Sequence, residues 1–146
     1  MLCGTSEMHT MTKQTLTFVL MDAPFESART TTAFRLLHAA LDRGCDVNVF
    51  AYEGAVALSF AKQAQHANAV HGRDTAQEDH PLSKNWIAAL MTHARERGAD
   101  LNWVNCGLCV DERGVGEAID GVRRGSPADC WKMAQQSVAT LVIPTK

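Results

Sequence analysis

Residues 100–109 read Asp100-Leu-Asn-Trp-Val-Asn-Cys-Gly-Leu-Cys109, and this stretch decides the predicted fold. Its first six residues have the apolar pattern of a buried strand, and two cysteines three positions apart follow directly. The carboxyl ends of strands in a parallel sheet are where such folds place their sites. We therefore expect Cys106 and Cys109 to be exposed at that edge, beside backbone N–H groups that favour a thiolate.

The entry into this strand has a counterpart earlier in the chain. Arg43-Gly-Cys-Asp-Val-Asn-Val and Arg97-Gly-Ala-Asp-Leu-Asn-Trp have the same layout of helix end, glycine turn and strand. Gly44 is expected to adopt a left-handed conformation at the first of these turns. The match is too short to indicate gene duplication, so we interpret it as one helix-to-strand turn that is used twice.

Strand and helix patterns alternate along the rest of the chain. Strands are predicted at residues 15–21, 46–52 and 139–143, and helices at 28–43, 55–64, 83–98 and from Ser126 onward. Ser27 and Ser126 are suitable N-caps, with Pro127 and Asp129 in the first turn of the last helix. Strands that alternate with helices indicate an α/β fold with a parallel sheet and helices on both faces. Trp103 and Trp131 are expected in its core.

Length and charge limit the kinds of function to consider. A chain of 146 residues suits one domain, so we expect a flexible tail over residues 1–13 and a single domain over 14–146. The net charge is −2 with no long basic run, which argues against direct nucleic-acid binding. No apolar stretch is long enough to span a membrane, and no secretory signal begins the chain, so a cytoplasmic location is expected. Residues 65–80 are polar and aperiodic and are expected to form a long loop, a kind of segment that often serves as a lid or binding segment, and its role is left open.

The chain has five cysteines, at positions 3, 45, 106, 109 and 130. An odd number with uneven spacing argues against a disulfide framework, and cytosolic thiols stay mostly reduced. Cys45 and Cys130 are therefore expected to be buried and inert.

Four interpretations of Cys106 and Cys109 remain open at this level. They are a persulfide carried on Cys106, a dithiol–disulfide pair, half of a zinc site, and two core cysteines. Zinc needs four ligands, and the chain has no second Cys-x-x-Cys, while His66 and His71 lie in a polar loop, so no metal is expected. Arg113 is the nearest following cation in the sequence and is a candidate to stabilise an anion at the site.

The surroundings of the two cysteines make one interpretation more specific. The run from Asp100 to Val115 resembles the DsrE/DsrF-like (DsrE/TusD) sulfur-relay family in its strand, in the cysteine at the strand end and in the later Arg113-Gly114 step. The resemblance extends from Thr15 to the end of the chain, with residues 65–80 as the part that does not match. It implies a three-layer α/β/α fold of flavodoxin-like topology, with a mostly parallel sheet of about five strands.

The resemblance also implies a function and partners. Cys106 would be the family's persulfide-bearing cysteine, and the protein a sulfurtransferase or sulfur carrier that receives sulfane sulfur and passes it to another protein. Donor and acceptor proteins such as a TusA-like carrier, a homotrimer or homohexamer, and no cofactor are implied.

Two alternatives are kept beside this one. The first is a thiol–disulfide oxidoreductase that uses Cys106 and Cys109, and the second is a non-catalytic subunit of a sulfur-handling complex. In a carrier, Cys109 would either attack the persulfide and release sulfide, or simply pack as a buried neighbour. The residues leave the donor, the acceptor and the direction of transfer open, and also the pathway, tRNA thiolation or sulfur oxidation.

Overall fold

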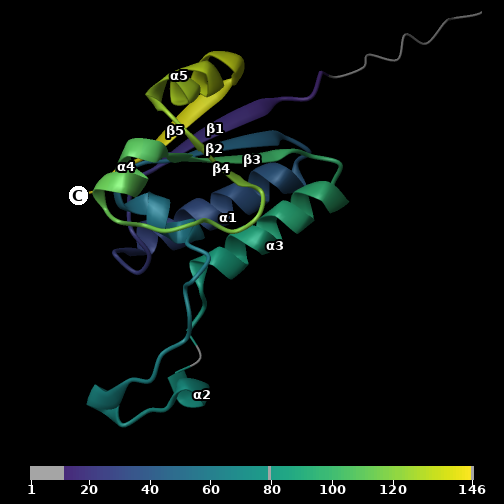
Figure 1. The fold of residues 1–146 in the computed structure, drawn as a ribbon. Coiled ribbons are helices and arrows are strands. Elements are labelled where there is room, and N and C mark those ends of the chain that lie inside the picture. Colours follow the sequence, from purple (N-terminus) through teal and green to yellow (C-terminus); the bar gives the residue numbers. More distant parts are fainter. Residues whose placement is uncertain (1–11, 79, 146) are drawn as a thin grey trace, which may run out of the picture.

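The computed structural model describes residues 12–78 and 80–145, so the predicted tail lies almost wholly outside the described residues. A five-stranded sheet forms the centre of the fold, with the order β4-β3-β2-β1-β5 (Figure 1). Every neighbouring pair is parallel. The strands are β1 (Thr15–Leu20), β2 (Asp46–Ala51), β3 (Leu101–Cys106), β4 (Val122–Gly125) and β5 (Ala139–Ile143).

Helices cover both faces of the sheet, which confirms the predicted three-layer α/β/α fold. Figure 1 shows α1 (Ala28–Asp42) and α3 (Ser83–Glu96) together on one face and α5 (Pro127–Gln136) on the other. Two shorter helices, η1 (Glu53–Ser59) and α4 (Gly107–Glu112), directly follow the carboxyl ends of β2 and β3. In the described part of the chain, no helix combines the length and the apolar character that crossing a membrane requires.

The larger core lies between the sheet and the α1/α3 layer. Trp103 is completely buried there and packs against Phe34 of α1, with 6.1 Å between the ring centroids. Phe34 also contacts Trp86 of α3 edge-to-face at 4.9 Å. The odd-numbered residues of β2 and β3 point into this core, because successive strand side chains alternate between faces. The helices supply the rest from their apolar stripes: Ala33, Leu37, Ala40, Leu41, Ile87, Leu90, Met91 and Ala94.

The structure contains the capping residues from which the starts and ends of the helices were predicted. Ser27 accepts a hydrogen bond from the Arg29 N–H at 3.1 Å and begins α1. Ser126 and Asp129 form a reciprocal capping box at the start of α5, with Pro127 in the first helical position. Gly44 has a φ of +75°, as the helix-to-strand turn requires.

Two segments differ from the predictions. The segment predicted as a helix over residues 55–64 is the 3-10 helix η1, which ends at Ser59. The chain leaves the helix there because Phe60 pairs with Ala118 in an antiparallel bridge. The polar stretch after the cysteines contains β4, a four-residue edge strand with two arginines that the apolar pattern missed.

Residues 65–80 are not a simple loop. They include two single helical turns, η2 (Ala69–His71) and α2 (Thr75–Glu78), in an arm that extends away from the sheet and its helices (Figure 1). A bridge between Asn68 and Arg73 closes the turn around η2. Whether the arm binds or covers anything stays a prediction.

The face of the sheet under α5 is only half covered. Polar side chains form a ladder across three strands, in which Asn102 Nδ2 donates to Asn48 Oδ1 at 3.0 Å and Asn48 Nδ2 donates to Thr17 Oγ1 at 3.4 Å. Thr17 Oγ1 continues the ladder to Ser137 Oγ at 2.7 Å. The expectation that Trp131 packs in the core is wrong: it lies on the outward side of α5 and is 66% exposed.

Candidate functional site around Cys106 and Cys109

Cys106 lies where the sequence places it, at the junction between β3 and α4. It is the last residue of β3 and also the N-cap position of α4, with an extended backbone (φ −61°, ψ 115°). Its register partner on β4 is Gly125. A Cβ atom at Gly125 would approach Val104 Cγ1 to 2.5 Å, so only glycine fits beside the cysteine at this edge.

The residue before Cys106 fixes the end of β3. Asn105 is buried on the opposite face and accepts a hydrogen bond from Trp103 Nε1 at 3.2 Å. Its own amide donates to Ser59 Oγ at 2.9 Å and so ties η1 to β3. A buried amide with these partners holds the strand end in one position, because losing them would leave polar groups unpaired.

The expectation that both cysteines are exposed is wrong. The structure leaves 2% of Cys106 and 4% of Cys109 accessible, and both cysteines are free. The reason is that α4 starts immediately after Cys106 and folds its first turn over the strand end, while α5 packs from the side. Both thiols lie in a second apolar cluster with Phe50, Val56, Val104, Val110 and Met133.

The two remaining described cysteines are less buried than predicted. Cys45 is half-buried against the main core, and Cys130 of α5 is half-buried against the cluster that holds Cys106. Burial raises the pKa of the Cys130 thiol. The expectation that they are fully buried is therefore wrong, while their inertness stays a prediction.

The two thiols of the motif lie in the same apolar cluster, and Cys106 is one of the groups that shift the pKa of Cys109. Burial is the main cause that raises the pKa of Cys109, and a hydrogen bond with the Cys106 side chain raises it further. The backbone N–H of Glu53 donates to Cys109 and acts in the opposite direction. Cys109 therefore stays a neutral thiol at pH values where an ordinary cysteine begins to ionise.

Glu53 connects the cysteine pair to a neighbouring cavity. It adopts a φ of +51°, a left-handed conformation that is uncommon outside glycine, at the start of η1. Its carboxylate pairs with Arg113, and both residues line a cavity of about 440 Å³. This cavity extends along the carboxyl ends of β1 and β2 and also includes Met21, Asp22 and Arg29. Arg113 thus faces Glu53, and its predicted role towards an anion on Cys106 stays a prediction.

Arg124 is a residue of this site that the sequence analysis missed. Its Nη2 donates to the Gly107 carbonyl at 3.1 Å and to Asp111 Oδ2 at 2.8 Å, so the guanidinium lies across the first turn of α4. The pKa of Arg124 is raised, mainly by the hydrogen bond and the charge of Asp111, and also by the Cys106 sulfur. A four-residue edge strand gives little sequence signal, which explains why Arg124 was overlooked.

Within the part of the chain that the structure describes, neither the cysteines nor the arm histidines belong to a metal-ligating cluster of three side chains. Among residues 12–78 and 80–145, the one group of three such side chains is His38, Asp42 and His93. It lies between α1 and α3, away from Cys106.

Comparison with known proteins agrees with this architecture. The model of the DsrE/DsrF-like family matches residues 14–143. The chain belongs to the DsrE/DsrF-like family. Proteins of this family are generally linked to sulfur relay and work with partner proteins.

Solved structures show the same fold. The crystal structure of the YchN protein from E. coli superposes with a TM-score of 0.68 at 19% sequence identity, covering 89% of this chain and 99% of that one. A conserved protein of unknown function from Bacteroides thetaiotaomicron, BT1422, gives a TM-score of 0.50 at 12% identity, covering 88% and 94%. Among curated protein sequences, none matches this DsrE/DsrF-like chain. At these identities the likeness establishes the flavodoxin-like α/β fold and nothing finer.

Proposed function

We propose that this DsrE/DsrF-like protein is a sulfur carrier or sulfurtransferase that accepts sulfane sulfur on Cys106 as a persulfide. The observation that carries the proposal is the position of Cys106, which ends β3 at the carboxyl edge of the sheet with a second thiol in the same apolar cluster. Membership of a family linked to sulfur relay supports the same chemistry.

The transfer step balances without a cofactor. The Cys106 thiolate attacks the terminal sulfur of a donor persulfide, and a new S–S bond forms on Cys106. The S–S bond of the donor breaks, and the donor cysteine leaves as a thiolate. A second transfer of the same kind passes the sulfur to an acceptor thiol.

The burial of Cys106 adds a requirement to this proposal. A donor sulfur reaches Cys106 only if the cover over the strand end moves. That cover is thin on one side, where Leu108 is 66% exposed and the Arg124 side chain lies across Gly107. We propose that the first turn of α4 and Arg124 shift when a partner docks, and that sulfur loading is slower than in a protein with an exposed thiol.

Cys109 has a consistent place in this scheme. Its raised pKa keeps it protonated while Cys106 reacts, so Cys109 does not compete for the donor. Once Cys106 carries a persulfide, attack by Cys109 on the Cys106 sulfur would release hydrosulfide and leave a disulfide. We propose that this reaction protects the protein when no acceptor arrives.

Intact mass spectrometry tests the proposal. Reduced protein is incubated with polysulfide, and the expected product is an adduct of one sulfur atom that Cys106→Ser abolishes. Cys130→Ser is the matched control, because Cys130 belongs to the same apolar cluster and its variant should load like wild type. Unchanged loading of Cys106→Ser would disprove the assignment, and loss of loading in Cys130→Ser would move the site to α5.

The presence of two free thiols in one apolar cluster also favours a second candidate function, thiol–disulfide exchange. This function requires a reversible Cys106–Cys109 disulfide and turnover of protein disulfides, which insulin reduction measures. Activity that survives Cys109→Ser excludes this mechanism. A protein that neither loads sulfur nor reduces insulin, but still binds a partner when both cysteines are serine, is a non-catalytic subunit.

A further inference from the structure

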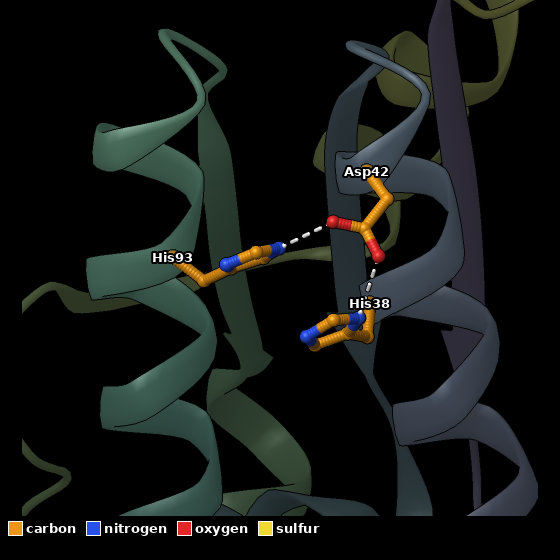
Figure 2. Close-up of side chains that lie close together, drawn as sticks. All are labelled: His38, Asp42 and His93. Atoms are coloured by element: carbon orange, nitrogen blue, oxygen red, sulfur yellow. Dashed lines mark hydrogen bonds and ion pairs between the residues drawn. The ribbon is translucent and has the colours of Figure 1, made fainter.

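Two histidines and an aspartate from separate helices meet on the outer side of the α1/α3 layer. His38 and Asp42 are one turn apart on α1, and His93 reaches them from α3 (Figure 2). Asp42 Oδ2 lies 3.1 Å from His38 Nδ1, and Asp42 Oδ1 lies 2.9 Å from His93 Nε2. The three ligand atoms all lie within 4.8 Å of one another.

We propose that His38, Asp42 and His93 form a binding site for a divalent metal ion of the zinc class. Zinc is held at about 2.0–2.2 Å by nitrogen and oxygen ligands, which places two ligands of a tetrahedral ion about 3.3 Å apart. The three ligand atoms lie within 4.8 Å of one another, so side-chain rotations must bring them to this spacing when the ion binds. Two imidazoles and one carboxylate suit zinc, nickel or copper rather than magnesium or calcium, which prefer oxygen ligands alone.

The surroundings support a cation at this position. The His38 and His93 rings are stacked, with centroids 4.2 Å apart and an angle of 11° between their planes, so one ring must turn about its Cβ–Cγ bond before both nitrogens point at one ion. All three residues lie in the last two turns of their helices, where the negative end of the helix dipole favours a positive charge.

The remaining contacts define which atoms are free to bind. Arg97 Nη2 donates to Asp42 Oδ1 at 2.7 Å, so Oδ2 is the oxygen available to a metal. Imidazole binds a metal through an unprotonated nitrogen, and each ring would carry its proton on the other nitrogen. Three protein ligands leave a fourth position open, and the rings border an open hollow of about 480 Å³ that Glu96 also lines.

This site is separate from the cysteines. Asp42 ends α1 just before the start of β2, which places the site at the amino edge of the sheet, while Cys106 lies at the carboxyl end of β3. The metal would join α1 to α3 and so stabilise the layer that covers the main core. The proposal therefore stands or falls independently of sulfur transfer.

Zinc titration of the tag-free full chain tests the proposal. Calorimetry should show saturable zinc binding, and His38→Gln/His93→Gln should bind one zinc ion fewer per chain than wild type. Zinc at a hundredfold excess over its Kd should raise the Tm of wild type by about 5–10 °C and leave the double variant unchanged. The matched control is His66→Gln/His71→Gln, which removes two exposed histidines of the arm and should bind zinc as wild type does.

Cobalt(II) in place of zinc identifies the ligands. Binding at the proposed site gives a visible spectrum without the thiolate-to-cobalt charge-transfer band, because all three ligands are nitrogen or oxygen. Three results overturn the proposal: no saturable zinc binding by wild type, unchanged stoichiometry in the His38/His93 variant, or a thiolate band that accounts for all bound cobalt. The Tm measured without metal shows that each variant is folded.

Discussion

The face of the sheet under α1 and α3 contrasts with the face under α5. The first is sealed by apolar side chains around Trp103, and two long helices cover it (Figure 1). The second has one ten-residue helix, a polar ladder from Asn102 to Thr17, and the buried thiol of Cys106. We expect the two faces to contribute unequally: the sealed face should supply most of the stability, and the half-covered face holds the thiol that the proposed sulfur transfer would use.

Replacing a tryptophan on each face gives the largest expected effect. Trp103→Ala removes a fully buried ring and should lower the free energy of unfolding by about 3–5 kcal/mol. Trp131→Ala removes an exposed ring of α5 and should change it by less than about 0.5 kcal/mol. Urea unfolding followed by circular dichroism measures both, and equal losses would break the contrast between the faces.

The polar ladder gives the next largest effect. Asn48→Ala takes away the central member and leaves Asn102 without its acceptor, which should cost about 1–2 kcal/mol of stability. Thr140→Ala is the control, because Thr140 is an exposed residue of β5 on the same face. A loss in Thr140→Ala as large as in Asn48→Ala would show that strand propensity, and not the ladder, sets the stability of this face.

The dependence of stability on alkaline pH tests the burial of the cysteine pair. The pKa of Cys109 is higher in the folded chain than in the unfolded one, mainly because of burial. The contribution of this thiol to the free energy of unfolding is therefore fully present below the pKa that Cys109 has in the unfolded chain. It is lost as the pH rises through the higher pKa of the folded chain. The free energy of unfolding should fall more steeply with alkaline pH in wild type than in Cys109→Ser. Parallel pH profiles of the two proteins would contradict this prediction.

The smallest expected effect concerns the two neighbouring arginines of β4. Arg124→Gln removes the positive charge beside Cys106 and should slow sulfur loading by a few-fold. Arg123→Gln is the matched control, because Arg123 pairs with Asp129 of α5, and its loading rate should stay that of wild type. Loading reactions that are quenched at successive times and analysed by intact mass spectrometry give the rates of sulfur loading. A faster Arg124→Gln variant would mean that the side chain acts mainly as a cover over the thiol.

Local patterns predicted most of the fold because each depends on a few adjacent residues. Ser27 and the Ser126–Asp129 box begin their helices as expected, and Gly44 takes its left-handed conformation. The apolar runs predicted β1, β2 and β3, which contain buried residues, and also β5, an edge strand that has none. The pattern failed at β4, since a short edge strand has no apolar run, and at Trp131, since α5 has only one contact face and this residue lies on the other.

The sequence predicted where the candidate site lies in the fold, but it did not predict which residues surround the site. Cys106 ends β3 as expected, while its burial and the proximity of Arg124 depend on how α4 and β4 pack together. The cluster of His38, Asp42 and His93 could not be predicted, because 51 residues separate Asp42 and His93 in the chain. The spacing of His38 and Asp42 on one helix was the only available signal.

The sequence by itself determined the order of β1, β2, β3, β5 and the long helices, the cysteine at the end of β3, and membership of a family of α/β proteins. These follow from local periodicity, caps and a short motif. Only the tertiary structure decided which thiols solvent reaches, which arginine lies beside Cys106, and which side chains meet between α1 and α3. Such contacts depend on the packing of segments far apart in the chain, and no local pattern encodes that packing.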